Sequence, residues 1–317
     1  MKAVRLATSL LAIAILALVL WRADPSELWR VLRHVDVGWL LLTVLLNLPI
    51  VAVASLRSLL ILRRLGRPVL PRLLISSTVL GYVAGAVTPA ASGELLRADA
   101  LRRAGVPMAE GVALVVYERA VSVALLALST GVLAALISLP LLWGLVVSGA
   151  ALAAVAALPL LPPAARIEGA GLARRAVRYA LGMAEQLRFL VADRSLMVAW
   201  SLLTVALFAL AAAQFTLLVA SVNGGLDPSE AWVAFGASQL AGVASLLPLG
   251  LGVADGSLAA VLQRLGTTLE QGSVVAVLVR ATVTLPLVLA ALASYVYLAR
   301  AGGGTPQPDL ERHATGK

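Results

Sequence analysis

Four charged residues interrupt apolar sequence and form two acid–arginine pairs. Glu94 precedes Arg119 and Asp255 precedes Arg280, and each member of the first pair lies 161 residues before its counterpart in the second. An arginine fork can hold two oxygens of one phosphate group. Ionisable side chains in such apolar surroundings are costly, so they indicate a functional site by default. The four residues are therefore candidates for binding an anion.

Both pairs belong to a duplicated stretch, Pro89–Arg119 and Pro248–Arg280. Each copy has a Pro/Gly break, a carboxylate, a short helical run, a glycine turn, and then an arginine inside a long apolar run. Broken apolar segments at corresponding places in two halves predict a transporter binding site. Helix rise places Arg119 and Arg280 roughly 15–17 Å into their spans, near the bilayer midplane. The breaks comprise Pro89, Gly93, Pro248, Gly250 and Gly252.

A scaffold role is the alternative for the same charges. Arg119 would pair with Glu118 or Glu94, and Arg280 with Asp255, which would lock each broken segment to the next helix. Glu94 would then be only a carboxylate at a half-helix N-terminus, where the helix dipole favours it. The recurrence of the whole unit favours a site, although a site also needs its scaffold.

Other chemistry finds little support in the sequence. There is no cysteine, and the two histidines, His34 and His313, lie far apart in a loop and a tail. No hydrolase, P-loop or paired-acid metal motif occurs, and the Gly-rich PLGLG run lacks dinucleotide-binding spacing. We therefore expect no catalytic residues, no metal and no cofactor.

The composition identifies the surroundings of these charges. Of 317 residues, 61% are hydrophobic and 13% charged, far from the balance of soluble domains. The sequence predicts an all-α, polytopic helical membrane protein. Because the +9 charge is carried by arginines beside apolar spans, anionic lipid headgroups explain it better than nucleic acid does.

Arginine runs set the expected orientation. Predicted spans at about 4–21 and 37–56 are followed by a loop with five arginines and no acid, which the positive-inside rule places in the cytoplasm with the N-terminus. Runs 108–138 and 141–161 then lead to a basic segment, 162–195. That segment is also cytoplasmic only if 73–104 enters the membrane and returns as a re-entrant hairpin. The arginines of the first loop are Arg57, Arg63, Arg64, Arg67 and Arg72.

The second half repeats the first with opposite direction. A span at 196–221 leads to an outer loop, a hairpin at 231–266 enters from outside, and a span at 271–299 returns to the cytoplasm. We predict a first membrane repeat at 1–140 and a second at 141–300, inverted in the membrane plane, and a disordered cytoplasmic tail at 301–317. Segment 162–195 is either an amphipathic surface helix or a helix packed on the bundle.

The paired motifs resemble a known family. TPAASGELLR followed by YER, and LLPLGLGVADG followed by LVR, are similar to the lysylphosphatidylglycerol synthase transmembrane region family of flippase-like membrane proteins, over about residues 1–300. The resemblance implies a translocase-type module. Where family patterns have Gly and Arg-Glu, this chain has Leu249 and Ala254-Asp255. Residues matching the family motifs are Glu94, Arg97, Arg119, Pro248, Gly250, Gly252 and Arg280.

We therefore expect a multi-pass protein of a bacterial inner membrane with both termini cytoplasmic. The leading hypothesis is a translocase of an anionic lipid, of phospholipid or polyprenyl-phosphate type, bound by Glu94, Arg97, Arg119, Asp255 and Arg280. A second hypothesis is a non-transporting membrane partner of a lipid-modifying enzyme or lipid-linked glycosyltransferase. An enzyme acting on lipid is the third. Two-domain members of the resembling family carry an aminoacyl-transferase domain that we do not expect here, so lipid aminoacylation is not carried over.

Overall fold

The computed structural model describes residues 25–67, 69–88, 93–137, 185–245, 247 and 250–301, and these form helices and their connections, with no strand. The predicted all-helical class is confirmed for this part of the chain. The first predicted span, the run 141–161, most of segment 162–195 and nearly all of the tail lie outside the described residues, as do Pro89 and Pro248.

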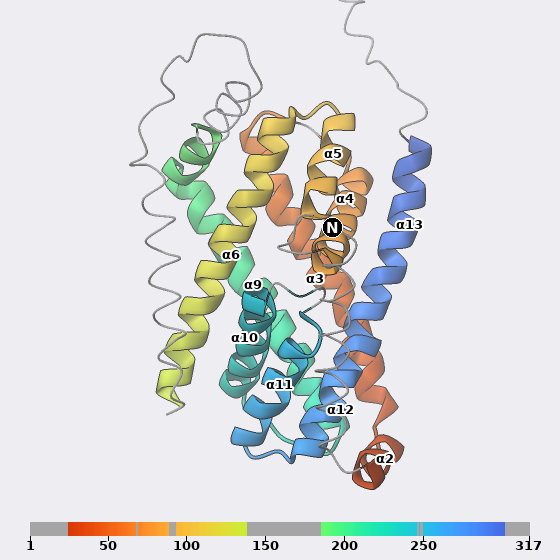
Figure 1. Ribbon diagram of the computed structural model, residues 1–317. Coiled ribbons are helices and arrows are strands. Elements are labelled where there is room, and N and C mark those ends of the chain that lie inside the picture. The colour runs from red at the N-terminus through yellow and green to blue at the C-terminus, as the bar shows by residue number, and fades with distance from the viewer. Residues whose placement is uncertain are drawn as a thin grey trace, which may run out of the picture.

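Four long apolar helices form the frame of the bundle (Figure 1). They are α3 (Val37–Arg64), α6 (Met108–Leu136), α9 (Arg194–Ser221), and the continuous run of α12 (Leu269–Val279), π segment η4 (Arg280–Thr284) and α13 (Leu285–Ala301). At 1.5 Å per residue, a helix of 28 residues is about 42 Å long, more than the roughly 30 Å of a bilayer's hydrocarbon core. All four are candidate membrane spans.

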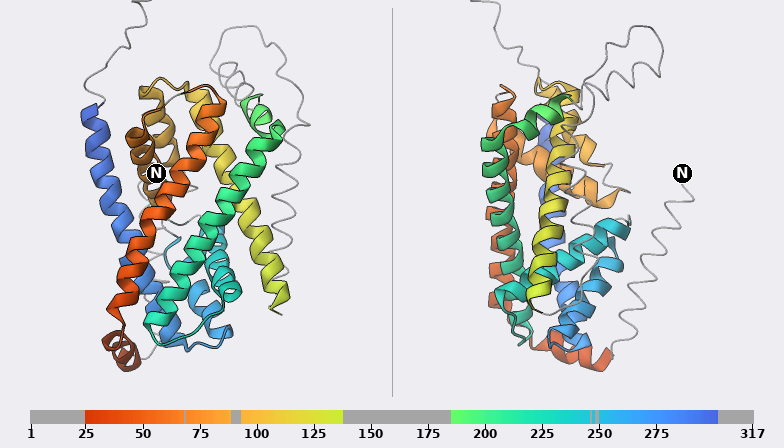
Figure 2. Two further views of the ribbon diagram at one scale, coloured as in Figure 1. Left: turned by 180° about the vertical axis from the view of Figure 1, so that it is seen from behind. Right: turned by 90° about the vertical axis from the view of Figure 1, so that its left-hand side faces the viewer.

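Two pairs of shorter helices lie between α6 and α13, on one side of α3 and α9 (Figures 1 and 2). The pair α4 (Pro71–Val87) and α5 (Leu95–Arg103) occupies the upper half in Figure 1, while α10 (Pro228–Ser245) and α11 (Val253–Arg264) occupy the lower half. Each pair starts at its own end of the bundle and turns back near mid-height (Figures 1 and 2). The predicted segments 73–104 and 231–266 correspond to these pairs.

Equivalent residues shape the two halves in the same way. Each half has a tight turn at an equivalent glycine with positive φ, Gly105 at +91° and Gly266 at +96°. A Cβ on Gly111 would lie 3.3 Å from the Cα of Ala98, and one on Gly272 would lie 3.0 Å from the Cα of Ala259. These pairs are again 161 residues apart, so α5 packs on α6 through the same small-residue contact as α11 on α12.

In each half, the first helix of the short pair packs against a long helix of the other half. Helix α4 packs against α13 of the second half, and α10 packs against α6 of the first. The central seam is formed by α3 and α9, two helices of equal length that run in opposite directions (Figure 2). Both begin at an aspartate N-cap, Asp36 and Asp193.

Two clusters of buried side chains fill the bundle. One joins α3, α6, α9 and the helical segment 185–192 around Trp200 and Tyr117, whose rings meet edge to face at 5.3 Å. The other joins α9 to α10, α11 and α12 around Phe208, Phe215 and Phe235. Leu187 and Leu190 of segment 185–192 are buried in the first cluster, which favours packing on the bundle over a free surface helix.

One boundary predicted from the sequence is wrong. The loop expected at 57–72 begins later, because α3 continues to Arg64. Arg57 is therefore part of the helix, and its side chain is buried. The run of arginines predicts a solvated loop, but the first of them is held inside the protein by α4, α6 and α9.

Candidate functional site

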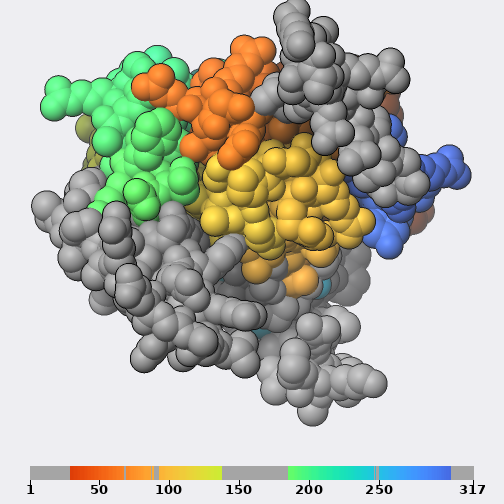
Figure 3. Space-filling model, turned by 90° about the horizontal axis from the view of Figure 1, so that it is seen from above, coloured from red at the N-terminus to blue at the C-terminus, as the bar shows by residue number. Residues whose placement is uncertain are grey.

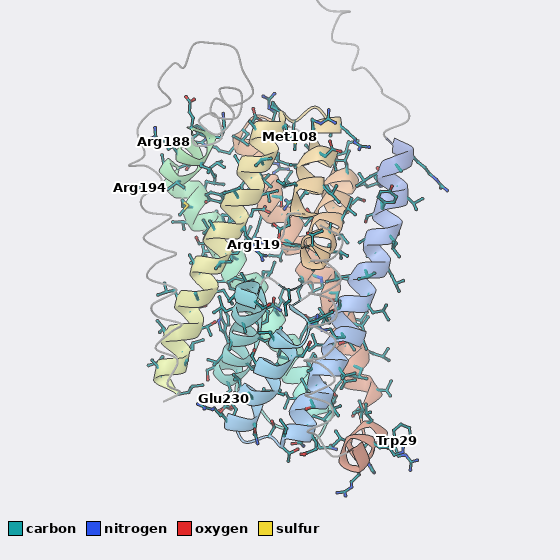
Figure 4. The ribbon with its side chains drawn as sticks, viewed as in Figure 1. Trp29, Met108, Arg119, Arg188, Arg194 and Glu230 are labelled. Atoms are coloured by element: carbon teal, nitrogen blue, oxygen red, sulfur yellow. The ribbon has the colours of Figure 1, made fainter. Side chains whose placement is uncertain are left out.

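The first acid–arginine pair connects the α4/α5 turn with α6. Glu94 stands immediately before α5, and its Oε1 lies 3.3 Å from Nη1 of Arg119. The Glu94 side chain is 14% exposed and that of Arg119 is 43% exposed. Figure 4 places Arg119 near mid-height in the bundle, between the two helix pairs. This ion pair is thus partly open rather than sealed in the core.

The second pair is made in the same way and is tighter. Arg280 donates from Nε to Asp255 Oδ1 and from Nη2 to Asp255 Oδ2, both at 3.0 Å. Asp255 is in the first turn of α11 and also accepts the backbone N–H of Gly252 at 2.9 Å, which fixes its position. Its side chain is 6% exposed, and that of Arg280 is 27% exposed. The pairings expected from the sequence are present in both halves.

The helix carrying Arg280 is irregular at that residue. Segment η4 starts at Arg280, and the Leu285 N–H bonds to the Arg280 carbonyl, a π-type connection. Pro286 has no N–H for the carbonyl of Thr282, which accepts instead from Asn47 Nδ2 at 2.8 Å. Single π turns inside α-helices are rare and occur frequently at functional sites.

Glycines allow the backbone to turn beside the acids. A Cβ on Gly93 would lie 2.1 Å from the Ala84 carbonyl oxygen, so only glycine fits there. Gly250 and Gly252 have φ of +59° and +79°, which glycine adopts without strain. The three glycines predicted as breaks are therefore at the turned-back ends of the helix pairs.

Arg97, which matches the family motif, lies deeper than the other predicted residues. Its guanidinium pairs with Glu118 and also donates to the Ser58 hydroxyl. Glu118 Oε1 accepts from Ser58 as well, at 2.7 Å. The Arg97 and Glu118 side chains are 5% and 7% exposed. This pair joins α5 to α6 and α3 inside the core.

Arg57 is a further buried cation that sequence reasoning missed. It is 3% exposed and donates to the hydroxyls of Tyr82 at 2.8 Å, Thr204 at 3.0 Å and Ser122 at 3.3 Å. Its guanidinium carbon lies 4.7 Å from the centre of the Trp200 ring. The signal in the sequence was the apolar run around it, ASLRSLLIL, which continues the span beyond residue 56.

One end of the bundle carries most of the exposed arginines (Arg63, Arg64, Arg72, Arg102, Arg103 and Arg194), and this basic end has a shallow cavity at its surface. In the space-filling view from above, the ends of α3, α5 and α6 and segment 185–192 share this face (Figure 3). A cavity of about 420 Å³ opens between α3 and α9. Its lining consists of Leu60, Arg63, Arg64, Asp193, Ser195, Leu196 and Ala199.

Asp193 and Glu110 bind arginines at this end. Asp193 pairs with Arg64. The Leu196 amide and the Ser195 hydroxyl hold the pKa of Asp193 below its ordinary value. Hydrogen bonds at 2.8 Å to both Glu110 oxygens raise the pKa of Arg67. These carboxylates are therefore already paired, while most of the other arginines at this end are exposed.

The described residues offer no group of three or more His, Asp or Glu side chains that could hold a metal ion. What they provide is a set of arginines and carboxylates paired at two equivalent places, within four apolar spans. Such a set can bind a phosphate or carboxylate group by ionic hydrogen bonds.

Comparison with known proteins agrees with the resemblance noted from the motifs. No curated protein matches the chain. A family model described as the lysylphosphatidylglycerol synthase TM region matches residues 6–291, which include both acid–arginine pairs and all four candidate spans except the last turns of α13. The chain is a multi-pass membrane protein that belongs to the lysylphosphatidylglycerol synthase TM region family.

Proposed function

We propose that this protein moves an anionic lipid between the two leaflets of a bacterial inner membrane, without chemical change to the lipid. The observation that carries the proposal is the equivalence of Glu94–Arg119 and Asp255–Arg280. Each pair stands where a short helix turns back, one approached from the basic end and one from the opposite end. A central site that either side can reach in turn is the arrangement used for alternating access.

The lengths of the helices support re-entrant segments. Helices α5 and α11 have 9 and 12 residues, well short of the roughly 20 needed to cross a bilayer. Irregular backbone at the depth of their turns is tolerated only where protein or water covers it. The exchanged packing of α4 on α13 and α10 on α6 supplies such cover. This packing, together with the equivalent contacts of α5 on α6 and of α11 on α12, supports two inverted repeats.

The partial exposure of Arg119 and Arg280 supports binding of a lipid phosphate. A lipid phosphodiester carries one negative charge and two acceptor oxygens that match the arginine fork. It can bind the exposed part of the Arg119 or Arg280 guanidinium while Glu94 or Asp255 keeps its ion pair. A partly exposed pair suits a carrier better than a sealed one, because the ligand reaches the arginine without removing the partner of a buried acid, which would be costly.

Arg280→Lys is the first test, because it keeps the charge and removes the fork. Purified protein in vesicles should exchange a fluorescent anionic phospholipid more slowly with this variant, while expression and the melting temperature Tm stay close to the original. Arg119→Gln combined with Arg280→Gln should nearly abolish exchange. Arg264→Gln, at the exposed end of α11, is the matched control and should leave the rate unchanged.

A folded double variant that moves lipid at the original rate would refute the proposal and leave the four charges as scaffold. Absence of exchange by the original protein, with several anionic lipids tried, would favour the role of a non-transporting membrane partner. A labelled phospholipid and a labelled polyprenyl phosphate, compared in parallel, would identify the lipid class.

A further inference from the structure

Arg57 differs from Arg97, the other arginine buried among the described residues, because its partners are neutral. Within the described residues its contacts are three hydroxyls and one indole ring, and no carboxylate lies within ion-pair distance. Its Nε is buried and has no hydrogen-bond partner. Burial of a guanidinium is expensive unless an opposite charge is supplied. Hydroxyl groups stabilise it by hydrogen bonding but leave its charge uncompensated.

The charges around Arg57 do not compensate it either. The buried carboxylate of Glu118 is hydrogen-bonded to Arg97 and Ser58. Glu94 is paired with Arg119. The cluster formed by these groups on α3, α5 and α6 therefore contains three guanidiniums and two carboxylates. One negative charge would balance it, and the cluster's counterpart in the second half, Asp255 with Arg280, is already balanced.

The position of Arg57 links it to the cavity at the basic end. Arg57, Leu60 and Arg64 follow at intervals of three and four residues, so they lie along one side of α3. That side faces α9, because Arg64 pairs with Asp193 and Arg57 contacts Thr204 and Trp200. Leu60 and Ala199 line the cavity. Arg57 is not part of the lining, but it lies one helical turn deeper in the bundle than Leu60, on the side of α3 that carries the cavity.

We propose that Arg57 binds the singly charged phosphodiester group of an anionic lipid that arrives through the cavity between α3 and α9. The inference rests on the proposed lipid translocation and adds a binding position on the basic side of the Arg119 site. Seven residues separate Arg57 from the end of α3, or about 10 Å of helix, against about 16 Å for Arg119 from the start of α6. The lipid phosphate would reach Arg57 first.

The surroundings suit a phosphate ligand. The hydroxyls of Tyr82 and Ser122 accept hydrogen bonds from Arg57, which leaves their O–H groups able to donate to phosphate oxygens. The Thr204 hydroxyl donates to the Trp200 carbonyl and is already used. The Trp200 ring covers one face of the guanidinium, so a ligand would approach along the edge where Nε has no partner.

Thermal unfolding in detergent tests this without requiring transport. The Tm of the original protein, Arg57→Gln and Arg57→Lys would be measured against short-chain phosphatidylglycerol, phosphatidylcholine of equal chain length, and sodium phosphate. Phosphatidylglycerol should raise the Tm of the original protein more than phosphatidylcholine does. In Arg57→Gln this difference should disappear, whereas the control Arg103→Gln, an exposed arginine of α5, should retain it.

Two further results distinguish ligand binding from a structural role. Without lipid, Arg57→Gln should melt at or above the temperature of the original protein, since an uncompensated buried charge has been removed. Arg57→Lys retains charge without the fork and should need roughly tenfold more phosphatidylglycerol for the same rise. A response to sodium phosphate as well would identify a general phosphate site, and a response to phosphatidylglycerol alone a lipid site.

An Arg57→Gln protein with the full phosphatidylglycerol response would overturn the inference. An Arg57→Lys protein whose Tm depends on phosphatidylglycerol concentration in the same way as that of the original protein would also overturn it. This second measurement is the test if Arg57→Gln does not fold. If exchange depends on Arg280 but the thermal response does not depend on Arg57, the inference fails and the proposed function stands. If the response depends on Arg57 but the original protein moves no lipid, the binding site stands and translocation fails.

Discussion

Burial divides the arginine–carboxylate pairs into two kinds. Both members of Arg97–Glu118 are sealed in the core and share the Ser58 hydroxyl. Arg119 and Arg280 keep part of their surface exposed while their acids are largely buried. A sealed pair has no surface left for a further ligand, whereas a partly exposed arginine can bind an anion while it keeps its own carboxylate. We therefore assign Arg97–Glu118 to the scaffold, although Arg97 matches the family motif.

This assignment predicts strong coupling between Arg97 and Glu118. Arg97→Gln leaves a buried carboxylate without its cation and should cost about 3–5 kcal/mol of stability, as should Glu118→Gln. The double variant, Arg97→Gln with Glu118→Gln, should be more stable than either single variant. Thermal unfolding of the four proteins in one detergent gives the coupling energy directly.

The surface pair Asp99–Arg103 provides the control for that cycle. Its side chains are solvated, so the same substitutions should change stability by no more than about 1 kcal/mol. Additive losses at Arg97 and Glu118 would contradict the scaffold assignment. If Arg97→Gln is nearly as stable as the original protein but no longer exchanges lipid, Arg97 belongs to the ligand site.

At the scale of helices, the irregular turn after Arg280 depends on a partner from the other half. Pro286 removes the donor for the Thr282 carbonyl, and Asn47 of α3 replaces it. Asn47 in turn accepts from Gln214 of α9 at 3.3 Å. A proline in the last span is thus accommodated by a polar contact that connects three long helices, and this contact holds the π segment beside Asp255.

We predict that Asn47→Leu destabilises the protein by about 1–3 kcal/mol, because a buried carbonyl loses its donor. Pro286→Ala restores the N–H at that position, so the combination Asn47→Leu with Pro286→Ala should recover part of the loss. The Tm values of the single and double variants measure this. An equal loss in the presence and absence of Pro286 would show that Asn47 acts through Gln214 instead.

The same helices show what sequence could predict. The apolar runs at 108–138 and 196–221 predict their spans, because the length of such a run identifies a membrane helix without any knowledge of what packs against it. The recurrence of the acid–arginine unit predicts the two ion pairs. Arg57 was missed because its side chain is stabilised by Tyr82, Trp200 and Thr204, from two other helices. The hydrogen bond of Asn47 to Thr282 was equally hidden, as it joins residues far apart in the sequence.

The whole molecule has two unlike ends and an apolar girdle. Large hydrophobic side chains are exposed along the sides of α3, α9 and α13, such as Leu48, Leu202 and Leu292, which suits lipid rather than water. Exposed arginines gather at the end formed by the close of α3 and α5 and the start of α9, namely Arg63, Arg64, Arg72, Arg102, Arg103 and Arg194. At the opposite end Asp36, Asp227, Glu230 and Glu270 accompany Arg30, Arg33 and Arg264. From the positive-inside rule we predict that the arginine-rich end faces the cytoplasm.

The last prediction tests this orientation and the inverted repeat together. Arg103 and Arg264 are equivalent positions, 161 residues apart, and both are exposed at the free ends of α5 and α11. If the halves are inverted, equivalent residues face opposite sides of the membrane. The chain has no cysteine, so single variants report cleanly. In intact cells, an impermeant thiol reagent should label Arg264→Cys and leave Arg103→Cys unlabelled until the membrane is opened. Arg67→Cys should behave like Arg103→Cys, since both lie at the basic end. Labelling of both Arg103→Cys and Arg264→Cys from outside would exclude the inverted arrangement, because parallel repeats place equivalent positions on one side.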